Sequence, residues 1–442
     1  MPSKPRSPFP PASAEVHRVT ALASEGDGIA RTAAGRVVFV VGGVPGDVVE
    51  LADVREHKGT LRARIARIVE ASPDRIAPGC ALFGQCGGCL WQHVRYSAQL
   101  AAKRANVRAA LERIGGLSVP GEVEIVESPD AYHYRARTRV VEVEGGVGYR
   151  RRGSNEVIRV EACPVLVPAA ETVLARHGRA IGEAQAAVRR RGPGPRSSAR
   201  APRAAGSERE WIVTAGSQGE ARVFPIQDSA GSAARSTPTH DPHAIAPPAL
   251  ELTVAGERLR VSGPGFVQGN ALLWDRLALE VRERCLGPRL EQAPTRFLEL
   301  YAGIGFLTLP LARAGLRGVA VESDRQAVAD LAFNLERAGL AGAVTAVSSR
   351  VEDRRELAHW LAEADLLLVD PPRVGLEPRV REAIARGGPA RVVYVSCDPA
   401  TLARDLKELV GAGYRLASVV AFDLFPQTPH VETIVRLERR PA

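Results

Sequence analysis

Several features that mark other classes of protein are missing from this chain of 442 residues. It has no run of about 18 apolar residues, which argues against a membrane-spanning helix and a membrane partner. Residues 1–14 are rich in proline and lack the apolar core of a secretory signal. We therefore expect a disordered lead-in there, followed by a cytoplasmic protein.

Cysteine is scarce and unevenly placed. The chain has six cysteines, at positions 80, 86, 89, 163, 285 and 397. In a chain without a secretory signal, disulfide bonds are a poor default. Clustered cysteines are then better explained as metal ligands or redox groups.

Negative charge is in deficit. The net charge is +9 and the isoelectric point about 9.6, while methionine occurs once. A basic protein is compatible with a nucleic-acid partner, but the excess is mostly arginine and part of it can reflect genome composition. The hydrophobic content of 45% is ordinary for a globular protein with a sizeable core.

The order of strand and helix patterns divides the chain into three regions. Residues 15–72 hold short strand patterns between glycine-rich turns, which predicts a small β-barrel. Residues 73–250 mix strands and helices, and flexible insertions are expected near 190–208 and 228–248, where Pro, Ala, Ser and Gly dominate. In residues 251–442 apolar strands alternate with helices, which predicts an α/β fold with a doubly wound, mostly parallel sheet. Ligands of such sheets bind beyond the carboxyl ends of the strands.

Three of the predicted strand ends suit a nucleotide-type cofactor. LELYAGIG places Gly303 and Gly305 on a strand-to-helix turn, where glycine lets the backbone approach a ligand, although a purely structural turn is the alternative. Glu322 ends the next strand, where a carboxylate can accept both ribose hydroxyls of an adenosine. Asp370 ends a third strand, because the two prolines after it cannot continue the ladder. No pyrophosphate-binding loop is complete, so this order fits S-adenosylmethionine better than NAD.

Four of the cysteines form a candidate metal set. Cys80, Cys86 and Cys89 make the pattern C-x5-C-G-G-C, and Cys163 follows much later, before a proline. Four thiolates suit zinc or an iron–sulfur cluster. A zinc site more usually shows two C-x2-C pairs, so this spacing favours iron–sulfur. Four unrelated buried cysteines are the alternative.

Cys397 stands apart from this set. In VVYVSCDPATLARDL it follows a strand and precedes a helix, at the edge where the fold places its active site. A thiol beside a helix N-terminus is expected to have a lowered pKa and to act as a nucleophile. Cys285, in a helical pattern, is expected to be inert. Glu432, next to His430 in HVETI, begins another strand and is placed to act as a base, with a surface strand residue as the alternative.

From about residue 15 to the C-terminus, apart from the insertions near 190–248, the chain resembles the RNA uracil-C5-methyltransferases. The resemblance is to the ribosomal-RNA type, which has a TRAM domain and an iron–sulfur cluster. It rests on CALFGQCGGCLWQH, FVQGN, LELYAGIG, VES, VDPPRVGL, SCDPATLARDL and HVETI.

This resemblance implies a role for each region and for single residues. The barrel would be a TRAM domain, an OB-like RNA-binding fold. Residues 73–250 would be an α+β iron–sulfur domain, and the rest a Rossmann-like, S-adenosylmethionine-dependent methyltransferase domain. Cys397 would be the nucleophile and Glu432 the base. S-adenosylmethionine would contact Gln268, Tyr301, Gly303, Gly305, Glu322 and Asp370, and a [4Fe–4S] cluster would bind Cys80, Cys86, Cys89 and Cys163.

The implied partner is RNA, with 23S ribosomal RNA favoured over transfer RNA, and the sequence gives no sign of more than a monomer. The family often has Cys where Ala302 stands and Asn where Phe306 stands. Arg350 lies where many relatives have an acidic or amide residue near the adenine. Phe306 keeps open the alternative of a non-catalytic RNA-binding or assembly protein. Phe422 and Phe425 are candidates to stack on the uracil.

Overall fold

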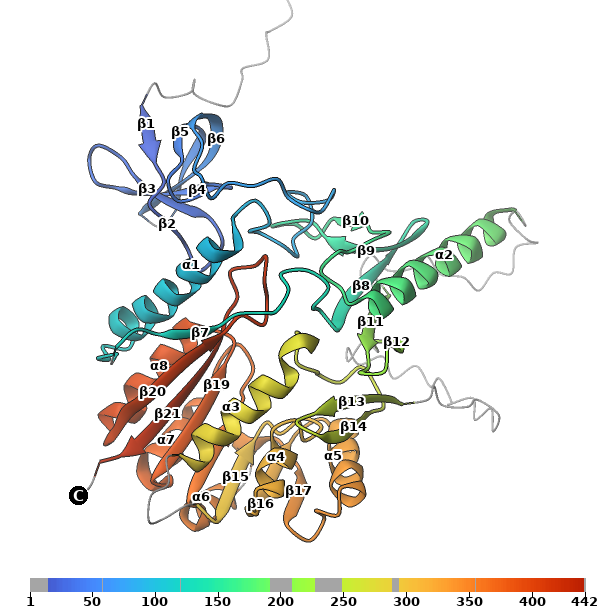
Figure 1. The fold of residues 1–442 in the computed structure, drawn as a ribbon, viewed down its shortest axis with the longest axis vertical. Coiled ribbons are helices and arrows are strands. Elements are labelled where there is room, and N and C mark those ends of the chain that lie inside the picture. Colours follow the sequence, from blue (N-terminus) through green and yellow to red (C-terminus); the bar gives the residue numbers. More distant parts are fainter. Residues whose placement is uncertain are drawn as a thin grey trace, which may run out of the picture.

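The computed structural model describes residues 15–57, 59–119, 121–190, 209–226, 249–287, 294–353 and 355–440. The predicted lead-in at 1–14 and nearly all of the two predicted insertions lie outside these residues. Three regions follow one another along the long axis of the molecule (Figure 1). The barrel lies at one end, the large sheet at the other, and the central region lies between them.

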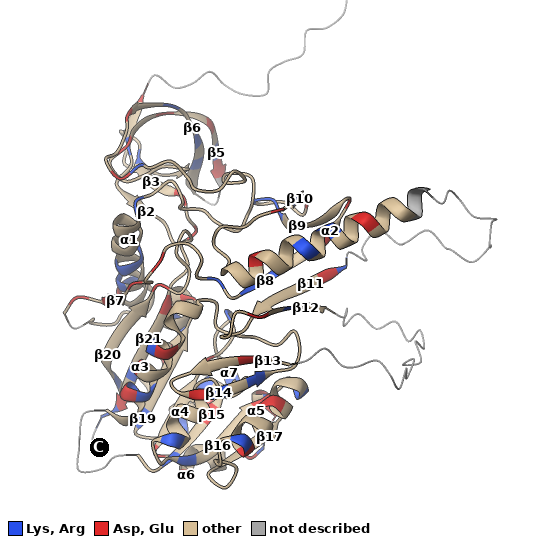
Figure 2. Ribbon diagram, turned by 45° about the vertical axis from the view of Figure 1, so that its right-hand side comes forward, with Lys and Arg blue, Asp and Glu red and all other residues tan. Residues whose placement is uncertain are grey.

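The N-terminal region is a six-stranded barrel with the strand order β1-β5-β6-β4-β3-β2. Its strands alternate buried and exposed side chains, as in β4, so Val38 and Val40 enter a small apolar core. Basic residues occur on β6 and on α1 (Figure 2). The strands are β1 (Val16–Arg18), β2 (Ala21–Leu22), β3 (Gly28–Arg31), β4 (Val37–Val41), β5 (Val48–His57) and β6 (Thr60–Glu70).

The central region combines a helix, α1, with a small antiparallel sheet. α1 (Tyr96–Ala109) continues into a single π-helical turn, Ala110–Ile114. The sheet has the order β10-β9-β8-β11-β12 and is covered by α2 (Pro168–Arg190). Its strands are β8 (Arg137–Val143), β9 (Gly146–Arg150), β10 (Val157–Arg159), β11 (Glu210–Ala215) and β12 (Ala221–Pro225).

The C-terminal region begins with a hairpin and a helix and is otherwise built on an eight-stranded sheet. The hairpin joins β13 (Leu250–Val254) to β14 (Glu257–Val261), and α3 (Trp274–Leu286) follows. The sheet has the order β17-β16-β15-β18-β19-β21-β20-β7, and β7 (Glu124–Val126) comes from the central region. The other strands are β15 (Arg296–Leu300), β16 (Arg317–Glu322), β17 (Val344–Ser348), β18 (Leu366–Val369), β19 (Arg391–Ser396), β20 (Tyr414–Phe422) and β21 (Glu432–Arg439).

Helices cover both faces of this sheet, as the predicted doubly wound fold requires. Leu366 and Leu368 of β18 enter one hydrophobic core, whereas Leu367 and Val369 enter the other. This double burial explains why the strand is apolar at every position. The helices are α4 (Thr308–Arg313), α5 (Arg325–Arg337), α6 (Leu357–Glu363), α7 (Pro378–Gly387) and α8 (Pro399–Gly411).

The strand order fixes where a ligand can bind. The chain runs from β15 outward to β16 and β17, and then returns to β18 on the other side of β15. The order therefore reverses between β15 and β18, and a crevice opens beyond the carboxyl ends of these strands. The predicted fold class is confirmed, with β21 antiparallel to both of its neighbours. In the part of the chain that the structure describes, no helix has the length and apolar character needed to span a membrane.

Candidate active site

A cavity of about 980 Å³ lies at the carboxyl edge of the sheet. Residues from eight separate stretches of the chain line it, because the ends of β15, β16, β17, β18 and β19 and the start of β21 meet there. Of the predicted site residues, the ones that line it are Gln268, Tyr301, Gly303, Glu322, Asp370, Cys397 and Glu432. The sequence-based prediction thus selected residues that the fold brings to one place.

The turn after β15 forms one wall of this cavity. Tyr301 and Gly303 adopt left-handed backbone conformations, with φ of 65° and 56°. The backbone N–H of Gly303 donates to Oε2 of Glu322 at 3.0 Å, and the amides of Ser323 and Asp324 donate to its Oε1. Glu322 therefore orders the turn as well as facing the cavity.

Gly305 has a different environment from Gly303. It does not line the cavity, and a Cβ at this position would lie 2.7 Å from methyl carbons of Leu309 and Leu331. Its φ is 92°. Glycine is therefore needed here for close packing of the turn against two helices, whereas its predicted contact with a cofactor stays a prediction.

Cys397 connects the end of β19 to the start of α8. Its environment contradicts the expectation of a lowered thiol pKa. Burial, with a smaller contribution from Glu432, raises the pKa of Cys397 to about 12. The helix N-terminus gives little help, because the Asp398 side chain already accepts hydrogen bonds from the amides of Ala400 and Thr401.

Two carboxyl groups lie near this thiol, Glu432, which is buried, and Asp370, which is partly exposed. Glu432, the first residue of β21, is only 3% exposed. Burial and the nearby Asp370 raise the pKa of Glu432 well above its ordinary value, and Arg373 opposes this shift. Burial also raises the pKa of Asp370, to about 7, and Nε2 of Gln268 donates to its Oδ2 at 3.2 Å. The cavity thus holds a thiol and two carboxyl groups that all retain protons more strongly than they do in water.

Two family models match this chain. One is described as tRNA (Uracil-5-)-methyltransferase and matches residues 251–440, and the other, the TRAM domain, matches residues 18–65. An uncharacterized RNA methyltransferase of Gloeobacter violaceus is 36% identical over 95% of each chain. The 23S rRNA (uracil(1939)-C(5))-methyltransferase RlmD of Halomonas elongata is 34% identical over 95% of this chain and 88% of its own.

These relatives and family models decide the assignment. The chain belongs to the RNA uracil-C5-methyltransferase family. A solved structure, the Pyrococcus abyssi tRNA (uracil-54, C5)-methyltransferase in complex with S-adenosyl-L-homocysteine, has the same fold. It has a TM-score of 0.67, 23% identity, and coverage of 96% of this chain and 100% of its own.

For this S-adenosylmethionine-dependent RNA uracil-C5-methyltransferase, the structure places the three positions at which the resemblance led us to expect departures from the family pattern. Ala302 and Phe306 are buried in the hydrophobic core and do not line the cavity. The case for an inactive protein that rested on Phe306 is therefore weakened. Arg350 does line the cavity, where its exposed guanidinium pairs with Glu352. The prediction that Phe422 stacks on the uracil is wrong, because this side chain is fully buried. Phe425, the other candidate, lines the cavity.

Arg373 is a residue of the methyltransferase site that the sequence reasoning missed. It lines the same cavity, and its positive charge lowers the pKa of the Cys397 thiol. Its Nη2 also lies 3.1 Å from Nε2 of His430. Burial lowers the pKa of His430 to about 4, so the neutral ring can accept from the guanidinium. The sequence did hold a signal for Arg373, because this residue directly follows the two prolines of VDPPR at a predicted strand end.

Replacing Arg373 by glutamine is expected to slow the alkylation of Cys397 by iodoacetamide. The thiolate is the reactive form, and loss of the cation raises the pKa of the thiol further. Each added pKa unit lowers the thiolate fraction about tenfold. In the parent protein the rate of Cys397 alkylation should rise about tenfold for each pH unit between about pH 7 and 11.

Peptide mass spectrometry distinguishes Cys397 from the other cysteines in this measurement. Arg350→Gln is the matched control, because Arg350 lines the same cavity but pairs with Glu352. Equal rates of Cys397 alkylation in Arg373→Gln and in the parent protein would contradict the activating role.

The four remaining predicted ligands lie in the central region. Cys80, Cys86, Cys89 and Cys163 line one cavity of about 170 Å³, apart from the methyltransferase cavity. Burial raises the pKa of Cys86, Cys163 and, to about 12, Cys89. Among the residues that the structure describes, no three His, Cys, Asp or Glu side chains form a group that could hold a metal ion. Cys285 lies in α3, as its helical pattern predicted, and is buried there.

Proposed function

We propose that this enzyme transfers a methyl group from S-adenosylmethionine to C5 of one uridine in 23S ribosomal RNA. The observation that carries the proposal is the single cavity lined by Cys397, Glu432 and Arg373 together with Glu322 and Asp370. It combines a nucleophile, a base and a cation with the strand-end acids suited to the methyl donor.

The chemistry of the uracil ring explains why both Cys397 and Glu432 are needed. C5 of uracil is a weak nucleophile, and a bond from the Cys397 sulfur to C6 turns the ring into an enolate with electron density at C5. S-adenosylmethionine supplies the electrophilic methyl group that C5 then takes, and S-adenosylhomocysteine is the leaving group. Glu432 removes the remaining proton from C5, the bond between sulfur and C6 breaks, and 5-methyluridine leaves with the thiolate restored.

The Cys397 thiol holds its proton at neutral pH in the free protein, because its pKa is raised to about 12. The reaction therefore requires a group that favours the thiolate. Arg373 is a cation that lines the same cavity, and its charge lowers the pKa of the thiol and so stabilises the ionised form. We assign Arg373 the role of thiolate stabiliser.

The methyl donor would be held by the residues at the carboxyl edge of β15, β16 and β18. Glu322 is placed to accept the ribose hydroxyls, as in other doubly wound nucleotide-binding folds. Asp370 is placed to face the positive sulfonium, which would lower its raised pKa. The full proposed set is Gln268, Tyr301, Gly303, Gly305, Glu322 and Asp370.

Ribosomal RNA is favoured over transfer RNA by the curated relatives. RlmD proteins of Halomonas elongata and Edwardsiella ictaluri, named for 23S rRNA, align with 95% of this chain at 34% and 33% identity. The transfer-RNA enzyme of Pyrococcus abyssi is 23% identical, which supports the common fold only. The N-terminal barrel, which matches the TRAM model, would hold the RNA backbone.

Mass mapping of 5-methyluridine in total RNA tests the substrate. Deletion of the gene should remove one 5-methyluridine from 23S ribosomal RNA, and the parent gene on a plasmid should restore it. The Cys397→Ala gene should not restore it. Loss of 5-methyluridine from transfer RNA alone would show that the substrate is transfer RNA. An unchanged 5-methyluridine content in all RNA would overturn the proposal.

We further propose a [4Fe–4S] cluster bound by Cys80, Cys86, Cys89 and Cys163. Each iron of such a cluster takes one thiolate, so the four sulfurs surround a volume and do not converge on one ion. A cavity lined by all four cysteines fits this requirement better than it fits a single zinc ion. The cluster would fold or hold the central region, since methyl transfer needs no electron.

Cys163→Ser is expected to lose most of the bound iron and acid-labile sulfide, because one of the four thiolates is removed. The protein is purified without oxygen, and iron, sulfide and zinc are measured per chain. Cys397→Ser is the matched control, since it removes a thiol from the other cavity and should keep four iron atoms. Stoichiometric zinc in the parent protein would contradict the cluster.

A further inference from the structure

The loop that joins β20 to β21, residues 423–431, shapes the methyltransferase cavity. Phe422 at the end of β20 pairs with Glu432 at the start of β21, so the loop leads directly into the proposed base. Phe425 of the loop lines the cavity. A Cβ at position 269 would lie 2.7 Å from its ring, so Gly269 allows Phe425 to lie there. The position of this loop therefore affects both the wall of the cavity and the base.

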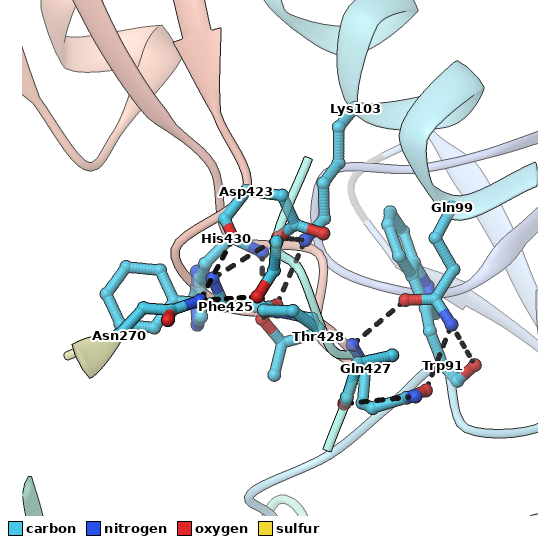
Figure 3. A network of polar contacts seen from close by, with 12 residues as sticks. Trp91, Gln99, Lys103, Asn270, Asp423, Phe425, Gln427, Thr428 and His430 are labelled. Carbon is cyan, nitrogen blue, oxygen red and sulfur yellow. Dashed lines mark hydrogen bonds and ion pairs between the residues drawn. The ribbon is translucent and has the colours of Figure 1, made fainter. Parts of the chain in front are cut away.

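Gln427 is the residue of the loop that is bound most completely by the central region (Figure 3). Its backbone N–H donates to Oε1 of Gln99 at 2.9 Å, and its Oε1 accepts from Nε2 of Gln99 at 2.9 Å. Its backbone carbonyl accepts from the amides of Leu90 and Trp91 at 3.0 and 2.9 Å. Gln99 and Gln427 thus form a reciprocal pair between residues 328 positions apart in the chain.

The backbone of Gln427 is strained in a way that these contacts maintain. Its φ is 67°, a left-handed conformation that is uncommon for residues other than glycine. Both Gln427 and Gln99 are buried, so an unpaired amide at either position would lack water as a substitute. The surrounding contacts therefore fix one conformation of the loop.

A second contact from the same helix reaches the start of the loop. Nζ of Lys103 lies 2.5 Å from Oδ1 of Asp423 and donates to the carbonyl of Phe425 at 3.0 Å. Both members of this ion pair are fully buried (Figure 3). A buried ion pair is weak evidence for stability, because desolvation offsets much of its attraction. The hydrogen bond from Lys103 to the Phe425 carbonyl instead indicates that Lys103 holds the loop in a fixed position.

Neither Gln99 nor Lys103 lines the methyltransferase cavity, so both act on it only through the loop. We propose that Gln99 and Lys103 of α1 are positioning residues that hold the 423–431 loop so that Phe425 and Glu432 face Cys397. This inference rests on the proposed function, because it assigns the loop a part in the removal of the C5 proton. Cys397 itself is fixed by the β19–α8 turn and should keep its position when the loop moves.

Gln99→Leu is the better test of the two residues. Lys103→Met would leave Asp423 buried without a partner and is expected to destabilise the whole protein. Gln99→Leu removes four hydrogen bonds, two with Gln427 and one each with the carbonyls of Trp91 and Val94, at similar side-chain size. Gln99→Glu is the second variant, since it keeps the acceptor for the Gln427 N–H and loses the donors. Val107→Ala is the matched control, because Val107 lies on α1 and is buried in the core with residues of α7 and α8.

The full-length variants are compared in kcat, KM for RNA, binding of S-adenosylmethionine, and hydrogen exchange of residues 423–431. We expect kcat of Gln99→Leu to fall about tenfold to a hundredfold, as for a misplaced catalytic group, with unchanged binding of the methyl donor. Covalent protein–RNA adduct should accumulate on denaturing gels, and the loop amides should exchange faster. Gln99→Glu should show a smaller fall, and Val107→Ala should lower the melting temperature without changing kcat or the adduct.

The possible failures are distinguishable. A parent protein that methylates no uridine overturns the proposed function. An active parent with a folded Gln99→Leu variant of equal kcat, or with loop exchange unchanged, overturns the positioning role alone. Equal losses of kcat in Gln99→Leu and Val107→Ala would also overturn it, since they would reflect stability. If Gln99→Leu does not fold, the same comparison is made with Gln99→Glu.

Discussion

Replacing Cys397 by alanine is expected to abolish methylation of RNA while leaving the binding of S-adenosylmethionine intact. The methyl group of alanine cannot form the bond to C6, so C5 of the uracil is never activated. The loss should be at least about 10⁴-fold in kcat, the scale seen when a covalent nucleophile is removed. The residues proposed to hold the methyl donor come from the segment before α3 and from the carboxyl ends of β15, β16 and β18, and they do not depend on this side chain.

The measurement uses tritiated methyl groups transferred to transcripts of 23S ribosomal RNA, with donor binding followed by calorimetry. Cys285→Ala is the matched control, because Cys285 is buried in α3 and lies outside the cavity. It should methylate RNA at the parental rate. Methylation by Cys397→Ala at a rate close to that of the parent would disprove the covalent mechanism.

Much of this site was predictable because strand ends are recognisable in a sequence. Glu322, Asp370 and Cys397 each follow an apolar strand, and the carboxyl ends of parallel strands meet at one edge. Glu432 was different, since residues alone left a surface position as the favoured interpretation. Only the resemblance to the family indicated its role, and the structure shows that it is buried in the same cavity.

The electrostatics of the site were not predictable from position alone. A helix N-terminus near Cys397 suggested a lowered pKa, but burial and Glu432 raise it instead. Burial depends on what every neighbouring element covers, and sequence patterns do not report that. Arg373 was missed for the same reason, because its electrostatic effect on Cys397 and its contact with His430 join three separate stretches of the chain.

Sequence patterns also did not predict the contacts between the central region and the C-terminal region. Gln99 and Lys103 lie on a helix whose pattern indicates only an amphipathic surface, and their partners follow more than 300 residues later. Phe306 illustrates the reverse error. The family comparison suggested a lost cofactor contact, whereas the side chain packs into the core next to the turn.

Replacing Glu432 by glutamine is expected to stop the reaction one step later than Cys397→Ala does. The amide has nearly the same size, so Cys397 can still attack C6 and C5 can still be methylated. It cannot accept the C5 proton, and loss of a general base typically costs about 10²–10⁴-fold. A covalent protein–RNA adduct should therefore accumulate and persist on a denaturing gel.

The raised pKa of Glu432 sharpens this expectation. Burial and Asp370 hold the proton on the carboxyl group, so the parent enzyme should resolve its adduct faster as pH rises and more of this group is ionised. The glutamine variant has no such group and should lose this pH dependence. The double variant Cys397→Ala/Glu432→Gln is the control and should form no adduct. Turnover at the parental rate in Glu432→Gln, without adduct at any pH, would assign the proton transfer to another residue. Asp370, the other carboxyl group in the cavity with a raised pKa, would be the next candidate.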